Sequence, residues 1–363
     1  MASALSQILS LRVTDLFRRQ GRYVSLDIGS SSVKLLEVEG EGGSLEVSSF
    51  AAVSLPPSAV QNNLVQEPET VAAGIREALK RSGASATQAI TAVPGPAVII
   101  KKIQLPSQSA NDLENAVLFE AGNFIPESLE NVNLDYMITD ILERDNQYEV
   151  LLVAVKKDII NSYVSAIRMA GLEPVVVDVD YFALENMFEV NYTPSDGQVV
   201  ALVNVGARYS CMNILRGNRS TFTGDVPVGG KEFNDAIVRN LGVTAVEAEN
   251  VKLGKSAEYP IEAVDPVLQP VKEFLTEEIH RALSFFWTAS TDESISAIYL
   301  SGGTAGMGGL RELLAERLEV PVEIVNPFAK VTMARGVDRA ALDKLAPSFA
   351  VAVGLGVRRP GDK

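Results

Sequence analysis

The stretch VSLDIGSSSVKLLEVE, residues 24–39, places a loop of small residues between two apolar segments that alternate like β-strands. Asp27 stands near the end of the first predicted strand, and the loop Gly29-Ser30-Ser31-Ser32 leads into the second. Backbone N–H groups and hydroxyls of such a loop can cradle phosphate oxygens. The Asp27 carboxylate can hold a hydrated Mg²⁺, and Lys34 can neutralise phosphate charge. A simple tight hairpin is the alternative interpretation of the same residues.

Working outward, the pattern predicts a complete unit around this loop. Its predicted elements are strands at 23–28, 33–38 and 45–53, a helix at 70–81 closed by Gly83, and a strand at 89–93 before Pro94-Gly95-Pro96. The loop joins two strands and has neither the P-loop pattern nor the glycine pattern of a dinucleotide-binding strand–helix turn. Those two kinds of nucleotide site are therefore excluded here.

The second half repeats this order. A strand at 199–205 ends in Asn204-Val205-Gly206, which follows Asp27-Ile28-Gly29 at a distance of 177 residues (204 − 27). Strands at 211–215 and 220–224 and a helix from about 231 to Gly242 complete the second copy. Long-range repetition of a strand–loop–strand unit predicts two similar α/β domains that face each other across a cleft.

Between the two copies, residues 97–177 have the order β-α-β-β-α-β, typical of a small split sheet inserted into the first half. The predicted elements are strands at 97–105, 134–141, 148–155 and 175–177 and helices at 112–122 and 157–170. A helix is expected at 180–188, just before the second copy. The C-terminal third predicts helices at 267–289 and 310–318, strands at 298–300 and 322–325, and a closing helix at 349–357. The predicted divisions are an N-terminal appendage (1–21), a first domain (22–96), the inserted subdomain (97–177), a connecting region (178–198), a second domain (199–345) and a closing helix (346–363).

Three further motifs in the second half can contact a nucleotide. Gly229 and Gly230 precede a helix whose N-terminus can face an anion. Glu249 and Lys252 lie three residues apart on a helix opened by the capping box at Thr244, and can hold a ribose and base or form a surface ion pair. Ser301–Gly309 contains Gly302, Gly303 and Thr304 and either supports a flat ligand on its backbone or is a flexible loop.

Composition excludes several classes of function. The 363 residues carry a formal net charge of −14, which argues against nonspecific nucleic-acid binding. One cysteine, Cys211, and one histidine, His280, cannot form a disulfide framework or a zinc site. Residues 3–20 resemble a basic amphipathic helix that lies on a membrane, on a partner or on its own domain. No signal peptide or run of about 20 apolar residues is evident, so the protein is expected in the cytosol.

The order of these motifs resembles the actin-like ATPase superfamily, which includes actin, sugar kinases and the division protein FtsA. The closest resemblance is to the PilM family of type IV pilus assembly systems, from about Arg22 to Arg359. The stretches that carry it are VSLDIGSSSVKLLEVE (24–39), AVPGPAVIIKKIQLP (92–106), NFIPESLENVNLDY (123–136), VPVGGKEFNDAI (226–237), YLSGGTAGMGGL (299–310) and FAVAVGLGVR (349–358).

The resemblance implies a two-domain actin-like fold with an FtsA-type insertion. It also implies ATP with Mg²⁺ in the cleft. The expected ligands are in the first loop (Asp27, Gly29, Ser30, Ser31, Ser32, Lys34), in the second motif at 204–208 (Asn204, Gly206), at Gly229, Gly230, Glu249 and Lys252, and in the loop with Gly302, Gly303 and Thr304. The helix at 180–188 takes the place of the connecting helix of that fold. Asp27 is the expected metal ligand. Asn204 stands where hydrolytic relatives carry Asp, so slow turnover is expected.

The resemblance further implies a cytoplasmic adaptor at the inner membrane that binds the N-terminal tail of PilN and contacts the pilus motor ATPases or platform protein. We expect the tail in a groove between the inserted subdomain and the first domain, beside Phe124, Ile125 and Pro126. Two alternatives stay open. One is an FtsA-like, filament-forming homo-oligomer; the other is a sugar or acetate kinase with Asp178 or Asp180 as its catalytic carboxylate.

Overall fold

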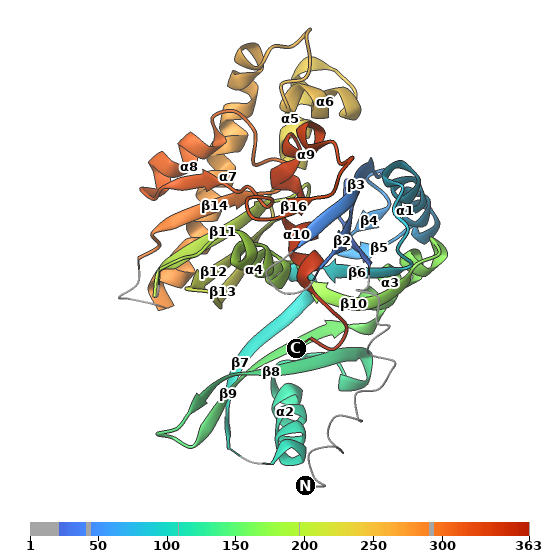
Figure 1. Ribbon diagram of the computed structural model, residues 1–363. Helices are drawn as coiled ribbons and strands as arrows, with labels where there is room; N and C mark the ends of the chain where they lie inside the picture. The colour runs from blue at the N-terminus through green and yellow to red at the C-terminus, as the bar shows by residue number, and fades with distance from the viewer. Residues whose placement is uncertain (1–21, 41–44, 108, 196, 290–293, 363) are drawn as a thin grey trace, which may run out of the picture.

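Two β-sheets built to one plan form the frame of the molecule (Figure 1). The computed structural model describes residues 22–40, 45–107, 109–195, 197–289 and 294–362, so the predicted N-terminal helix and most of the turn at 40–43 lie outside the described residues. The first sheet has the strand order β10 (Glu173–Val179), β6 (Gln88–Val93), β1 (Tyr23–Ile28), β2 (Ser32–Glu39), β3 (Glu46–Ser54), β16 (Thr332–Met333). The second has the order β15 (Val322–Ile324), β14 (Ala297–Ser301), β11 (Val199–Val205), β12 (Ser210–Arg216), β13 (Arg219–Val226).

The strand pairing repeats between the sheets. In each, three antiparallel strands are followed by two parallel ones: β3-β2-β1 then β6 and β10, and β13-β12-β11 then β14 and β15. The register repeats as well, because Ile28 pairs with Val33 and Val205 pairs with Ser210, each across a loop of the same length. The predicted duplication is therefore present in the backbone.

The first helix of each unit ends in the same way. Helix α1 (Pro68–Ser82) begins with a proline and stops at Gly83, whose φ is 70°. Helix α5 (Gly230–Leu241) stops at Gly242, with a φ of 68°. The left-handed conformation favours glycine because it has no Cβ, so both stops follow from the sequence.

The remaining helices sort into layers. α1 and α3 (Lys157–Met169) pack on the outer face of the first sheet, and α4 (Asp180–Asn191) and α10 (Ala350–Val357) lie between the two sheets. α5, α7 (Ile261–Ala289) and α8 (Leu310–Leu318) share a core on the far side of the second sheet. Two further helices are short, α6 (Ala245–Lys252) and α9 (Arg339–Asp343). The strands β4 (Val60–Gln61) and β5 (Leu64–Val65) form a small hairpin.

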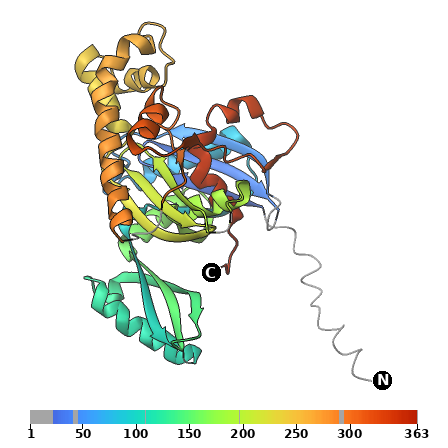
Figure 2. The ribbon, with the colours of Figure 1, turned by 90° about the vertical axis from the view of Figure 1, so that its left-hand side faces the viewer.

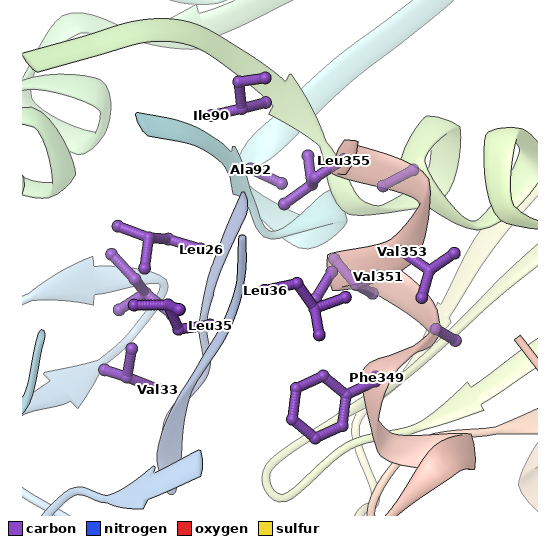
Figure 3. Packing of buried hydrophobic residues seen from close by; sticks show 14 of the residues in the cluster. Leu26, Val33, Leu35, Leu36, Ile90, Ala92, Phe349, Val351, Val353 and Leu355 are labelled. Carbon is purple, nitrogen blue, oxygen red and sulfur yellow. The ribbon is translucent and has the colours of Figure 1, made fainter. Parts of the chain in front are cut away.

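Helix α10 closes the core of the first domain. Phe349, Val351 and Leu355 point toward the sheet residues Leu36 and Ala92 (Figure 3). On its other side the helix touches α4 so closely that a Cβ on Gly354 would lie 1.6 Å from the Ala183 carbonyl oxygen. Only glycine permits this approach, which fixes α10 against α4.

The inserted subdomain projects away from both sheets (Figures 1 and 2). It consists of β7 (Val98–Pro106), α2 (Ala110–Phe124), β8 (Val132–Leu142) and β9 (Gln147–Lys156), with the strand order β7-β9-β8. α2 covers one face of this sheet, where the two share a small apolar core.

The structure corrects the extent of this insertion. The predicted split β-α-β-β-α-β sheet at 97–177 included the last helix and strand, but β10 pairs with β6 in the first sheet, and α3 packs against α1. The same helix–strand pair, α8 and β15, ends the repeated unit of the second domain. The pattern along the sequence gives the type of each element and does not say which sheet a strand joins.

Candidate functional site

The first loop turns sharply at the end of β1. The Gly29 N–H donates to the Ser32 carbonyl at 3.0 Å. Asp27 and Lys34 face each other across the β1–β2 pair, and the Lys34 Nζ lies 2.8 Å from the Asp27 Oδ2. The loop therefore presents a carboxylate, a cation and three hydroxyls within a few residues.

The second loop has the same backbone with other side chains. The Gly206 N–H donates to the Tyr209 carbonyl at 3.1 Å. Asn204 and the buried Cys211 occupy the places of Asp27 and Lys34. The Asn204 Oδ1 accepts a hydrogen bond from the Ser301 hydroxyl at 3.2 Å, which ties this loop to the glycine-rich loop after β14.

The start of α5 holds the second loop in place. The Gly230 and Lys231 N–H groups donate to the Gly206 and Ala207 carbonyls, both at 2.8 Å, and the Gly229 N–H donates to the Glu232 side chain at 2.9 Å. The sequence suggested that these groups face a ligand, whereas the protein itself uses them. Glycine is needed here for contact, since a Cβ on Gly229 would lie 2.7 Å from the Gly206 carbonyl oxygen.

Lys252 lies at the centre of the second domain's candidate site. Its side chain is 4% exposed, and its Nζ lies 2.7 Å from the Glu249 carboxylate, which also accepts from Asn234. A Cβ on Gly230 would meet both the Lys252 Nζ and the Thr304 hydroxyl. The Glu249–Lys252 pair is thus a part-buried ion pair at the meeting point of three motifs, and an isolated surface pair is excluded.

The glycine-rich loop leaves open backbone beside this point. Gly302 has a φ of 97° and approaches the backbone of Val205 so closely that a Cβ would lie 2.3 Å from the Val205 carbonyl oxygen. At Gly303, Gly306 and Gly308 a Cβ would meet no atom within 4 Å. The Lys252 ammonium and the Thr304 hydroxyl offer hydrogen-bond donors, and the loop offers open backbone. Together they fit a nucleoside whose base end lies near Lys252 and Gly303.

A cavity of about 360 Å³ lies between the two loops. The first domain supplies Gly29, Ser30 and the hairpin residues Asn62 and Asn63, and the second supplies Arg208, Tyr209 and Asp225. Among the described residues, no group of three or more His, Cys, Asp or Glu side chains is placed to hold a metal ion. The residues fit Mg²⁺ bound mainly through phosphate and water, with Asp27 as the nearby carboxylate.

Asp180 joins the two domains. Its Oδ1 accepts from the Gly95 N–H of the first domain and its Oδ2 from the Tyr209 hydroxyl of the second, both at 2.8 Å. Burial raises the pKa of Asp180 to about 7, against the opposing effect of the Tyr209 hydrogen bond. Both oxygens of this candidate catalytic carboxylate therefore hold protein groups. The other candidate, Asp178, lies 3.1 Å from the Arg358 guanidinium.

A second cavity, of about 730 Å³, separates the inserted subdomain from the rest. One wall is the face of the β7-β9-β8 sheet opposite α2, with Met137, Leu151 and Val153, and the other includes Val177 of β10 and Phe182 of α4. Phe124, Ile125 and Pro126 are not among its lining residues. Ile125 is buried in the core under α2, and Phe124 stacks with Lys101, whose Nζ lies 5.5 Å from the ring centroid. The predicted groove residues are thus on the wrong side of the sheet for this cavity.

The family model for the type IV pilus assembly protein PilM matches residues 25–360. The chain belongs to the PilM family. Among solved structures, a PilM-PilN type IV pilus biogenesis complex is similar, with 31% identity, a TM-score of 0.82, and coverage of 94% of this chain and 100% of that chain. The predicted family is therefore confirmed.

More distant relatives support the actin-like branch. The cell division protein FtsA of Bacillus subtilis is 21% identical over 356 residues, which cover 84% of this chain and 78% of FtsA. MreB5 of Spiroplasma citri, solved with ADP, is 12% identical with a TM-score of 0.50, covers 92% of this chain and 94% of its own, and is similar in fold alone. The two-domain actin-like fold is confirmed. No helix in the described part of this PilM-family chain is long and apolar enough to cross a membrane.

Sequence reasoning missed several residues of these two sites. Arg208 belongs to the predicted second motif, residues 204–208, whereas the adjoining Tyr209 was left out; its place in a repeat of the first loop was the available signal. The turn Asn62-Asn63 was a hairpin signal that the interpretation left out. The walls of the larger cavity at Phe182 and Arg358 had no local signal, because they come from separate elements.

Proposed function

We propose that this chain is an ATP-binding adaptor in the cytoplasm, at the inner face of the inner membrane, which takes the N-terminal tail of PilN into its larger cavity. The observation that carries the proposal is that cavity, which lies between the inserted sheet and the β10–α4 segment. In this proposal the protein reaches the membrane through its partners and contributes to pilus assembly and twitching motility.

The strand β8 supports an extended peptide as the occupant. It is an edge strand of its sheet, and residues 133–139 line the cavity in an unbroken run. An edge strand can pair with an added strand through its backbone, while apolar pockets receive alternate side chains. Leu151, Val153 and Val155 on the neighbouring β9 provide such an apolar floor.

For ATP, the proposed ligands are residues of both domains. Asp27, Lys34, Ser30, Ser31 and Ser32 with Gly29 face the phosphates from the first domain, and Asn204 and Gly206 from the second. The nucleoside is proposed beside Gly229, Gly230, Glu249, Lys252, Gly302, Gly303 and Thr304. Bound Mg²⁺ would supply charge neutralisation at the phosphates, where Asp27 takes part directly or through water.

Slow or undetectable hydrolysis belongs to the same proposal. Asn204 has no carboxylate to organise a water, and both oxygens of Asp180 are engaged by Gly95 and Tyr209. The chain is thus proposed to use ATP as a ligand that joins its two domains. Contacts with the motor ATPases or platform protein, and self-association, extend the proposal to surfaces outside both cavities.

A synthetic PilN N-terminal tail tests the partner site. Fluorescence anisotropy would measure its affinity for the wild-type chain and for Met137→Glu, which puts a charge into the cavity wall. We expect a loss of at least about tenfold, since the bound tail would cover Met137, which is 40% exposed in the free chain, and covering an unpaired charge is costly. Ile141→Glu is the matched control, because Ile141 is an exposed apolar residue of the same strand outside the cavity lining.

The outcome that contradicts the peptide site is an unchanged affinity in Met137→Glu, or a cross-linking map that places the tail beyond Val199. The nucleotide site is tested separately by calorimetry with Mg-ATP. Asp27→Ala should weaken binding about tenfold or more, because it removes the carboxylate beside the phosphate loop. An unchanged affinity would exclude Asp27 from the site.

A further inference from the structure

The first 22 residues have a basic, apolar pattern to which the proposed function gives no role. Apolar residues recur there at intervals of three or four, the spacing of one helix face: Leu5, Ile8, Leu9, Val13, Leu16 and Phe17. Residues 3–22 also hold four arginines and a single acidic residue, Asp15. Since residues 1–21 lie outside the described residues, the part of the fold that bears on them is the surface where the described chain begins.

That surface is the edge of the first sheet at which β1, β6 and β10 begin. The three strands are parallel and their first residues lie side by side, whereas the first loop follows the other end of β1. The Arg22 Nη1 donates to the Ser85 hydroxyl at 3.5 Å. The end of residues 1–21 therefore lies beside the turn between α1 and β6.

This edge presents more exposed cations than exposed carboxylates. Five of its basic side chains are exposed, on the start of β1 and on the C-terminal halves of α1 and α3: Arg22, Arg76, Lys80, Arg81 and Arg168. Three of the five pair with Glu39, Glu77 and Glu173, of which only Glu173 is fully exposed. Glu37 is buried beneath the turn, where it accepts from the Ser85 and Ala86 N–H groups.

The charge of this edge is opposite to that of the whole chain. A protein with a net charge of −14 is repelled by an anionic surface unless its cations face that surface. Each Lys or Arg close to an anionic bilayer attracts it, and the attraction falls off within a Debye length of about 8–10 Å. The edge at the start of β1 would therefore be the side of the first domain that approaches such a bilayer.

The apolar residues of the segment have no matching surface at this edge. Among the described residues, Met169, which is 47% exposed, is the exposed large apolar side chain of α1, α3 and the strand starts around Arg22. The other exposed large apolar side chains lie on the inserted subdomain, on α6 and α7 and on β15. A bilayer buries an apolar helix face at its headgroup boundary and needs no groove in the protein.

The C-terminal residues place the start of β1 close to the larger cavity. Arg358 lines that cavity, and the guanidinium of the next residue, Arg359, lies 5.1 Å from the ring centroid of Tyr23. In both views the end of the chain lies between the first sheet and the inserted sheet (Figures 1 and 2). The segment therefore joins the fold near the cavity that we assign to the tail of an inner-membrane protein.

We propose that residues 3–20 bind directly to a bilayer that contains anionic phospholipid, with the six apolar side chains at the acyl boundary. The arginines of the segment and the basic edge around Arg22 would then face the headgroups. The choice of the inner membrane rests on the proposed function, whereas the binding to lipid does not depend on ATP or on PilN.

Flotation of the full chain with vesicles, in the absence of PilN, tests this inference. Binding to vesicles of phosphatidylglycerol and phosphatidylethanolamine should exceed binding to phosphatidylcholine about tenfold or more, and should weaken as salt rises. Leu9→Glu puts a charge on the apolar side and should lower the affinity at least about tenfold. The matched control is Phe285→Glu, at an exposed apolar residue of α7, which should leave the affinity unchanged.

A second pair of variants tests the basic edge. Lys80→Glu should lower the affinity for the anionic vesicles about threefold, because it reverses one charge at the edge. Arg239→Glu reverses an exposed charge on α5 of the second domain and should have no effect. Equal losses in both variants would mean that net charge alone governs the binding, which contradicts the assigned edge.

Three results would overturn the inference. The first is a wild-type chain that binds the anionic vesicles only when PilN is present, which would make the segment a partner site. The second is a melting temperature that falls by several degrees in Leu9→Glu without vesicles, which would place the segment on its own fold. The third is unchanged vesicle binding in Leu9→Glu. The affinity of Leu9→Glu for the PilN tail should equal that of the wild type, so a failure of the peptide site and a failure of lipid binding are distinguishable.

Discussion

The first and second loops share one backbone conformation and differ in their side chains. Gly29–Ser32 and Gly206–Tyr209 close the same turn with the same register, 177 residues apart (206 − 29). The first loop faces an ion pair, Asp27–Lys34, and the second faces Asn204 and the buried Cys211. The two units therefore share the turn and differ in the side chains beside it.

The difference separates two tasks. The first loop keeps charged groups that suit a metal–phosphate ligand. The second loop binds the rest of the protein: its carbonyls accept from α5, Tyr209 donates to Asp180, and Arg208 donates to Pro57. The first loop therefore has charged groups close together, and the second makes the contacts that join the two domains.

The largest expected effect comes from replacing the first glycine of each loop, Gly29 or Gly206, by alanine. A Cβ on Gly206 would lie 2.8 Å from the Tyr209 carbonyl oxygen, whereas one on Gly29 would lie 3.5 Å from that of Ser32. We expect Gly206→Ala to lower the free energy of unfolding by about 3 kcal/mol, because overpacking against backbone forces a shift. Gly29→Ala should change it by less than about 1 kcal/mol. Thermal unfolding of both variants checks this, and equal losses would contradict the asymmetry.

The second prediction concerns the joining role of Tyr209. In Tyr209→Phe the buried Asp180 loses one hydrogen bond, at a cost of about 1–2 kcal/mol. The pKa of Asp180 is raised from 3.8 to about 7 in the folded chain, so the folded state holds the proton more tightly, and this group's contribution to stability falls as pH rises from about 4 to about 7. Loss of the hydroxyl raises this pKa further, so the variant should be more destabilised at pH 8 than at pH 6.

Melting temperatures of the wild-type chain and Tyr209→Phe at pH 6 and pH 8 provide the measurement. Glu185 also titrates near this range, since burial raises its pKa to about 7, but it is common to both proteins and cancels in the difference. The control is Asp180→Asn, in which Tyr209→Phe should cost the same at both pH values. If the loss of melting temperature caused by Tyr209→Phe in the wild-type background were the same at pH 6 and pH 8, the hydrogen bond from Tyr209 would not affect the ionisation of Asp180.

The smallest expected effect comes from giving the second loop the carboxylate that the first loop has. Asn204→Asp restores a carboxylate opposite Cys211, at the place of Asp27. We expect ATP turnover to rise severalfold and to stay below about 1 s⁻¹, because no second catalytic group is in place. A phosphate-release assay measures both proteins. A wild-type rate above that value would refute the proposed role of Asn204 in limiting hydrolysis.

Local patterns predicted most of the fold. Strand β1 and helix α8 have the predicted bounds, and the glycine stops at Gly83 and Gly242 are in place. The prediction assigned β10 to the wrong sheet. Its partner β6 is separated from it in the sequence by the whole insertion. The hairpin β4–β5 and the strand β16 were missed because each strand has only two residues, too few for a period to appear.

The candidate site, too, was predicted from the sequence only in part. Loop glycines follow from sequence because a turn needs them, and the structure brings Gly206, Gly229, Gly230 and Gly302 into contact around one loop. The bonding of the first N–H groups of α5 did not follow, since their partners are the carbonyls of Gly206 and Ala207 in the second loop. The groove prediction named residues on the side of the inserted sheet that α2 covers, whereas the larger cavity lies at the other face of that sheet. A period of two gives the two faces of a strand and leaves open which one is covered.

Elements of the first domain lie on both sides of the second domain in the sequence, which has a consequence for how the protein folds during synthesis. β16, at residues 332–333, supplies the sixth strand of its sheet, and α10, at residues 350–357, covers β1 and β2. All five strands of the second sheet lie within residues 199–324. A ribosome releases the chain from its N-terminus, and domains usually fold in that order. Here the later domain has its whole sheet while the earlier one still waits for its last helix. Of the two domains, the one that comes first in the sequence is therefore completed last.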